Sequence, residues 1–82
     1  MNIYAIQLPN GTIYGVDRQP DGTEGGPLVF ENRNDAAQRA DFMAGTIITR
    51  DLDTILKTGH HNLYLRLANG QTRAYIRKDL TR

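Results

Sequence analysis

The stretch LYLRLANGQTRAYIRK, residues 63–78, decides the fold class predicted for this chain. Apolar and polar residues alternate on both sides of Asn69-Gly70, and a period of two is typical of half-buried strands. Asn-Gly is also the preferred pair for a two-residue type I′ turn, because both central positions of that turn need a positive φ. The stretch therefore predicts a β-hairpin that closes the fold.

A two-residue turn at Asn69-Gly70 divides the side chains of this hairpin between two faces, since opposed residues share a face. The predicted core face consists of Leu63, Leu65, Leu67, Ala74 and Ile76. The predicted outer face consists of Asn62, Tyr64, Arg66, Arg73, Tyr75 and Arg77. Arg66 directly opposes Arg73 in this register. A like-charged pair of this kind is destabilising, so a sequence selected only for stability would tend to avoid it.

Two interpretations of the exposed tyrosines and arginines stay open. Guanidinium planes beside tyrosine rings suit stacking on bases and bidentate contacts with phosphates or carboxylates, and both residue types are enriched at protein hot spots. The candidate partner-binding residues are therefore Tyr64, Arg66, Arg73, Tyr75, Arg77 and Lys78. In the alternative, the arginines pair with acids of the N-terminal half, for which the candidates are Asp17, Asp21, Glu24 and Glu31. The register is the uncertain step, because a three-residue loop would shift it and remove the Arg–Arg opposition.

The segment NIYAIQLPNGTIYGVDR, residues 2–18, predicts a second hairpin. Tyr4, Ile6 and Leu8 alternate with polar or small residues and lead to another Asn-Gly pair at residues 10–11. The following segment QPDGTEGGP, residues 19–27, is rich in glycine and proline and contains almost nothing apolar, which indicates a loop.

Two helices and two short strands are expected between the hairpins. NRNDAAQRADFMAG, residues 32–45, predicts the main helix, which Asn32 or Asn34 can cap and Gly45 can end. Its small-residue face suits close packing on a sheet and consists of Ala36, Ala37, Ala40, Met43 and Ala44. DLDTILKTG, residues 51–59, predicts a short helix capped by Asp51. The short strands are expected at residues 28–31 and 46–49.

Together these elements predict one α+β domain over residues 1–82. Its sheet is small and mostly antiparallel, built from the two Asn-Gly hairpins plus the short strands, with the main and the short helix on one face. A chain of this length buries only a modest core.

Charge is distributed unevenly along the chain, although the net charge is only +1. Residues 1–44 contain three arginines and six acids, whereas residues 45–82 contain seven basic residues and three aspartates. The two halves therefore carry −3 and +4. Either they neutralise each other in the fold, or the basic half faces an acidic partner.

No catalytic or metal-binding pattern stands out in the sequence. There is no cysteine, which rules out disulfides and Cys-based zinc sites and fits a reducing cytoplasm. His60 and His61 are adjacent and would point to opposite faces of a strand, a poor metal pair. Asp51 and Asp53 are better explained as helix capping, and the glycines at 22, 25 and 26 lack phosphate-loop spacing. We therefore expect neither an enzyme nor a metal or cofactor, and no apolar run approaches the length of a membrane span.

The leading hypothesis is a non-enzymatic interaction protein, a monomer or homodimer, that binds an acidic partner by occlusion or recruitment. The partner is nucleic acid or a protein complex that handles nucleic acid. In size, composition and α+β architecture alone, the chain is similar to the small proteins of phages and mobile elements, anti-CRISPR inhibitors among them. That resemblance implies an inhibitor role and assigns no residue. The alternative hypothesis is a structural or assembly module that acts by strand addition or homo-oligomerisation.

Overall fold

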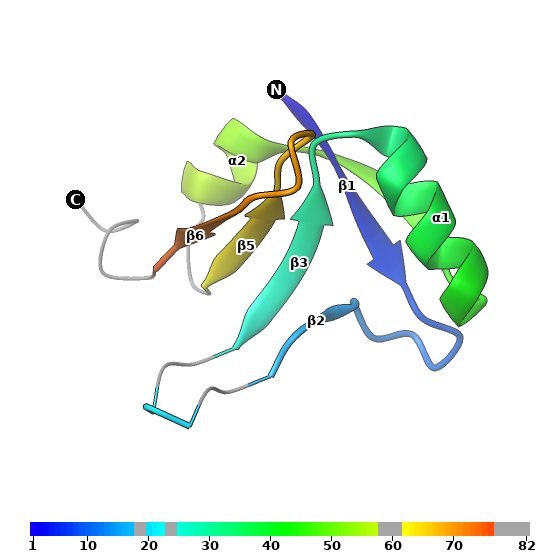
Figure 1. Cartoon of the computed structure of the whole chain (residues 1–82), viewed down its shortest axis with the longest axis horizontal. Helices are drawn as coiled ribbons and strands as arrows, with labels where there is room; N and C mark the ends of the chain where they lie inside the picture. Colours follow the sequence, from blue (N-terminus) through cyan, green and yellow to red (C-terminus); the bar gives the residue numbers. More distant parts are fainter. Residues whose placement is uncertain (18–19, 23–24, 58–61, 77–82) are drawn as a thin grey trace.

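The structure is a computed structural model that describes residues 1–17, 20–22, 25–57 and 62–76. It confirms the α+β class and the predicted order of elements, with a six-stranded, mostly antiparallel sheet and two helices (Figure 1). The elements are β1 (Asn2–Gln7), β2 (Gly15–Val16), β3 (Gly26–Phe30), α1 (Arg33–Met43), β4 (Thr46–Asp51), α2 (Leu52–Lys57), β5 (Leu63–Arg66) and β6 (Thr72–Tyr75).

The strands lie in the order β4-β1-β3-β5-β6, and β2 pairs with β3. Every pairing is antiparallel except that of β3 with β5, which is parallel. In this parallel pair Phe30 lies beside Arg66. The chain segment that joins two parallel strands must cross over, and here it contains α1, β4 and α2. As a result, the C-terminal hairpin lies next to the end of β3 from which α1 begins.

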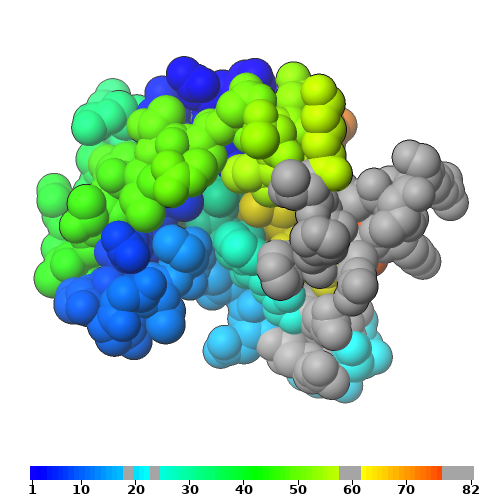
Figure 2. All heavy atoms as spheres, turned by 180° about the vertical axis from the view of Figure 1, so that it is seen from behind, coloured from blue at the N-terminus to red at the C-terminus, as the bar shows by residue number. Residues whose placement is uncertain are grey.

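Both faces of the sheet are buried, each under its own helix. On one face Ile6, Leu28 and Phe30 pack with Ala36 and Ala40 of α1. On the other face Ile3, Ala5 and Val29 pack with Leu52 of α2. Figure 2, seen from behind, shows the yellow-green residues of α2 on that second face. The structure thus differs in one respect from the expectation that both helices share a face. The chain reverses into α2 directly after the edge strand β4, which places α2 behind the sheet.

The predicted helix caps are confirmed. The Asn32 side chain accepts hydrogen bonds from the amides of Asn34 (2.8 Å) and Asp35 (3.4 Å) at the start of α1. At the other end the left-handed residue is Ala44, with φ 55°, and the predicted stop Gly45 follows it. A Cβ on Gly45 would collide with Ile6, so this glycine serves the close approach of α1 to β1.

The two Asn-Gly segments adopt the same loop, and it is not the predicted two-residue turn. The amides of Gly11 and Gly70 donate to the carbonyls of Leu8 and Leu67, each over 2.9 Å. The amides of Leu8 and Leu67 in turn donate to the carbonyls of Thr12 and Gln71. Only the glycine of each Asn-Gly pair has a positive φ, 88° for Gly11 and 89° for Gly70. This is a three-residue loop, a type I turn followed by a bulged glycine.

The glycine-rich segment is shorter as a loop than predicted, because its last residues belong to β3. Gly26 and Pro27 pair with Val16 and Gly15 of β2. A Cβ on Gly26 would collide with the backbone of Asn62, and a Cβ on Gly15 with that of Gly26. The glycines therefore allow three chain segments to approach one another closely at this end of the sheet.

Candidate functional site

The three-residue loop moves the C-terminal hairpin by one position from its predicted register. The observed pairs are Leu63–Tyr75, Tyr64–Ala74, Leu65–Arg73 and Arg66–Thr72. A shift of one residue turns a whole strand over. Arg73 and Tyr75 therefore share a face with Leu63 and Leu65, whereas Arg66 shares the opposite face with Thr72. The predicted opposition of Arg66 and Arg73 is wrong, and so is the single exposed face of tyrosines and arginines.

The tyrosines of this hairpin belong to the two cores. Tyr64 is 9% exposed and packs with the α1-side cluster, and the half-buried Tyr75 packs against the α2-side cluster. Arg77 and Lys78 lie outside the described residues. Of the six candidate residues, Arg66 and Arg73 thus remain as cations on opposite faces of the hairpin. Whether any of the six contacts a partner stays a prediction.

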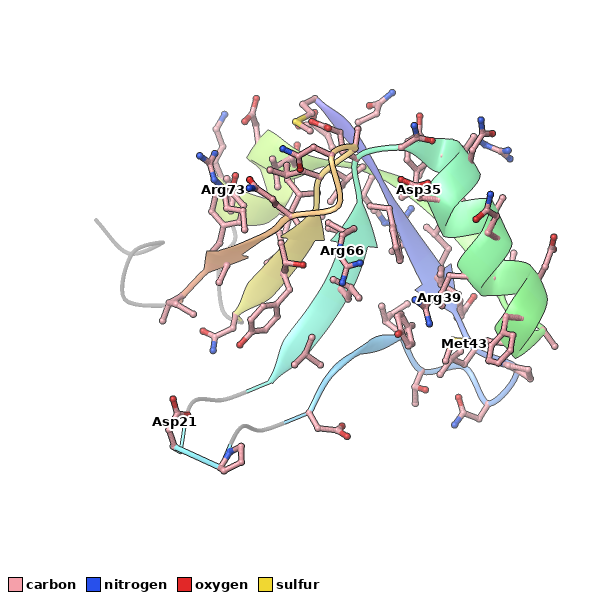
Figure 3. The ribbon with its side chains drawn as sticks, viewed as in Figure 1. Asp21, Asp35, Arg39, Met43, Arg66 and Arg73 are labelled. Atoms are coloured by element: carbon pink, nitrogen blue, oxygen red, sulfur yellow. The ribbon has the colours of Figure 1, made fainter. Side chains whose placement is uncertain are left out.

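Arg66 lines a groove between α1 and the C-terminal hairpin (Figure 3). The groove has a volume of about 580 Å³. Figure 3 shows Arg39 of α1 and Arg66 of β5 directed into this space from opposite sides, whereas Arg73 points away from it. The groove is lined by Phe30, Asp35, Gln38, Arg39, Phe42, Arg66, Ala68, Asn69 and Gly70.

One stripe of α1 forms a whole wall of the groove. Asp35, Gln38, Arg39 and Phe42 are spaced i, i+3, i+4 and i+7, which places them on one side of a helix. Phe42 is 85% exposed. Arg39 and Phe42 were not predicted as site residues, because the alanine pattern marks only the buried face of this helix. The available signal was an aromatic residue among polar residues on the side of the helix away from the buried alanines.

Both arginines are held by neighbours within the protein. The Arg66 Nε–H donates to the Thr72 hydroxyl over 2.9 Å, across the β5–β6 pair. The Arg39 guanidinium carbon lies 6.0 Å from the centroid of the Tyr14 ring, at the outer limit of a cation–π contact. An arginine has five N–H donors, so Arg66 keeps four for a ligand after its bond to Thr72.

Glu31 positions the hairpin wall of the groove. Its carboxylate accepts a hydrogen bond from the Ala68 amide (2.9 Å), and its own amide donates to the Arg66 carbonyl (2.9 Å). This acid was a candidate for neutralising the hairpin arginines, but it binds the loop backbone instead. Within residues 1–17, 20–22, 25–57 and 62–76, the one ion pair joins the Met1 ammonium to Asp51. Neither groove arginine is therefore paired with a carboxylate of the described chain.

The groove carries groups for binding anions and aromatic or apolar side chains. Arg39 and Arg66 supply charged donors, Phe42 supplies an apolar ring, and Asp35 is the single acid among the lining residues. No lining residue is a serine, cysteine, histidine or lysine, so the groove contains no pair of nucleophile and base. Among the described residues no three His, Cys, Asp or Glu side chains are grouped as metal ligands. His60 and His61, which the sequence indicates to be a poor metal pair, lie outside those residues.

Comparisons of this chain with protein families, curated proteins and solved structures find no match. None of the described helices is both long enough and apolar enough to cross a bilayer. The geometry of the groove is therefore the basis for a functional proposal.

Proposed function

We propose that this protein is a non-enzymatic interaction protein that binds an acidic partner in the groove between α1 and the C-terminal hairpin. The observation that carries the proposal is the convergence of Arg39 and Arg66, from two distant parts of the chain, on one groove beside an exposed phenylalanine. Its action is occlusion or recruitment of a nucleic acid or of a protein complex that handles nucleic acid, in the cytoplasm, which the lack of cysteine favours. The phage-type inhibitors that it resembles in size and architecture act in this manner.

Three features of the groove support binding over a purely structural role. A pair of like charges facing one space costs stability unless counter-charges balance it. The groove sets one carboxylate, that of Asp35, against two arginines, and neither arginine forms an ion pair among the described residues. Arginine and aromatic residues together are the composition typical of interface hot spots. A groove of about 580 Å³ is also within the usual size of ligand sites, about 300–1,000 Å³.

The test is a charge reversal in the groove with a matched reversal outside it. Arg39→Glu/Arg66→Glu should abolish binding to three probes, which are peptides selected from a displayed random library, single-stranded oligodeoxythymidylate and a mixed-sequence DNA duplex. Arg50→Glu/Arg73→Glu makes the same double reversal on the opposite face of the sheet and should leave binding intact. Circular dichroism spectra of all variants should match that of the wild type. The proposal fails if no probe binds at low salt, or if both reversals weaken binding equally.

A specific observation also favours strand addition as a second candidate. β4 is an edge of the sheet formed by the described residues. The Leu52 amide donates to the Met1 carbonyl (2.9 Å), so by alternation the backbone groups of Ile47 and Thr49 point away from β1. This edge could therefore pair with the same strand of a second copy.

Light scattering on a size-exclusion column separates the two candidates. Under strand addition the wild type is a dimer, and Thr49→Pro converts it to a monomer by removing an outward N–H while the β1–β4 ladder stays complete. A monomeric wild type would exclude homodimerisation at this edge and leave the groove as the candidate site.

A further inference from the structure

The acidic partner can be specified further from the number and placement of the charges. A single DNA strand carries one negative charge per about 3.4 Å, and tight binding neutralises several phosphates in succession. The groove offers two arginines, and Asp35 on the same wall would repel a continuous line of phosphates. Its positive charge therefore matches one or two isolated carboxylates better than a nucleic-acid backbone.

The remaining described cations do not extend the groove into a basic track. Arg33, the first residue of α1, is not among the residues that line the groove. In the registers of their strands, Arg50 pairs with Ile3 and Arg73 pairs with Leu65, and both partners belong to the α2-side core. Lys57 is in α2 itself. These three residues thus lie on the opposite side of the sheet from Arg39 and Arg66. A strand of nucleic acid lying in the groove would meet no further cation from them.

An apolar anchor lies beside the two charges. Phe42 follows Arg39 by three positions on the same helix face and is 85% exposed, whereas the two alanines of the opposite stripe, Ala36 and Ala40, are buried. Covering an exposed phenylalanine ring with a partner's apolar side chain removes apolar surface from water and stabilises the complex. Arg66 is oriented by Thr72, so its outer N–H groups can receive a carboxylate in a bidentate manner.

We infer that the groove binds a short segment of a partner protein in which two carboxylates, received by Arg39 and Arg66, adjoin an apolar or aromatic side chain that packs on Phe42. This inference rests on the proposed function and names the partner as protein rather than nucleic acid. The Ala68–Gly70 side of the groove is tied to β3 through Glu31, so the segment enters a site whose hairpin wall is already in place.

The inference predicts the composition of selected peptides. A displayed random peptide library selected on the wild-type protein should yield sequences with two acids next to an aromatic or large apolar residue. A fluorescein-labelled selected peptide should lose about tenfold or more in affinity on Arg66→Gln or Arg39→Gln, and to a similar extent when its own glutamates become glutamines. Arg73→Gln is the matched control and should change nothing.

Phe42→Ser separates the apolar contact from the charges. It should lower the affinity for the selected peptide several-fold. The salt dependence of that affinity should stay that of the wild type, because no charge is lost. An unchanged affinity of Phe42→Ser would overturn the apolar part of the inference. Selection of sequences without acids would overturn the carboxylate part.

The nucleic-acid probes distinguish failure of this inference from failure of the proposed function. If the oligodeoxythymidylate or the duplex binds in the groove and no peptide is selected, the partner is a nucleic acid and the inference is wrong, whereas the acidic-partner function stands. If neither class of probe binds, both are wrong. Selected peptides that bind Arg39→Glu/Arg66→Glu as well as the wild type would overturn the groove as their site.

Discussion

Asp51 is the residue at which three stabilising contacts meet. Its carboxylate accepts hydrogen bonds from the Thr54 hydroxyl (2.9 Å) and the Thr54 amide (3.0 Å), which cap α2. Its other oxygen lies 3.3 Å from the Met1 ammonium. The bonds from Thr54, and then the ammonium, lower the pKa of Asp51 below its ordinary value of 3.8. The ionised form is therefore favoured in the folded state.

This lowered pKa predicts an acid-sensitive part of the stability. Because the folded pKa lies below the unfolded one, the contribution of Asp51 is fully present above the unfolded pKa and is lost as the pH falls through the folded pKa. The melting temperature of the wild type should therefore decline below about pH 4 to 5. Asp51→Asn should show a shallower decline, measured by circular dichroism melts across that range.

Asp53→Asn is the control for this prediction. It removes the same charge from the first turn of the same helix, and among the described residues Asp53 forms no ion pair with Met1. Its acid profile should follow that of the wild type. Equal flattening of the two profiles would mean that overall charge, and not the contacts of Asp51, sets the dependence.

The decisive element is the loop of the C-terminal hairpin, because its length sets the register of β6. The Leu67 amide donates to the Gln71 carbonyl over 2.7 Å, so Leu67–Gln71 is a hydrogen-bonded pair and the next pair, Arg66–Thr72, is not. Side chains of a non-hydrogen-bonded pair are close, with Cα atoms about 4.5 Å apart. This spacing is within the range that a disulfide spans.

Engineered disulfides should therefore report the register directly. The chain contains no cysteine, so Arg66→Cys/Thr72→Cys introduces the only two thiols. They should form a disulfide in all molecules under mild oxidation. Arg66→Cys/Arg73→Cys places its two thiols on opposite faces and should keep both free. Thiol titration of the oxidised, folded proteins gives the result. The reverse outcome would restore the two-residue turn and the opposition of the two arginines.

Most elements were predictable because each has a local signal, but the return strand expected after Asn10-Gly11 is only Gly15–Val16 and pairs with β3, not with β1. Alternation at Tyr4, Ile6 and Leu8 predicted β1, and Asn32 and Asp51 were recognisable as caps from their position before a helical pattern. The register was not, because Asn-Gly serves both two- and three-residue loops. Pro9 was a usable signal in the first hairpin, since proline favours the second position of a type I turn.

The groove was not predictable from local patterns. Arg39 and Arg66 meet only because β3 and β5 pair in parallel, and a parallel pair joins segments that are far apart in the sequence. The placement of α2 on the opposite face was likewise not predictable from local patterns. It depends on how β4 extends the sheet beyond β1, for which the sequence contains no short-range signal.

At the scale of the whole molecule, one sheet supports two cores. Ile3 and Ile6 are both fully buried, but Ile3 packs on the α2 side and Ile6 on the α1 side. Both residues lie in β1, which pairs with β3 and β4. Loss of either core therefore releases the strand on which the other is built, and the two should unfold together.

Ile3→Ala and Ile6→Ala should each destabilise the protein by about 2–5 kcal/mol, the range for a buried aliphatic side chain. In urea, NMR amide signals of Ala40 in α1 and Leu52 in α2 should disappear with one midpoint in the wild type and in both variants. Separate midpoints for the two amides would show that the α1 and α2 sides are independent folding units. NMR spectra of each variant in water that match the wild-type spectrum would establish that each variant starts from the same fold.

The bulged glycine of the C-terminal hairpin also has an evolutionary consequence. A substitution in the Ala68–Gly70 loop that favoured the two-residue turn at Asn69-Gly70 would shift the pairing by one residue and turn β6 over without altering β5 or either helix, because side chains alternate along a strand. Arg73 and Tyr75 would then join Arg66 on the α1 side, and Ala74 would take their place beside Leu63 and Leu65. A single codon changed in an otherwise unchanged gene would thus exchange the chemistry of one edge of the protein, giving a lineage under pressure to change partners a route that leaves the rest of the sheet intact.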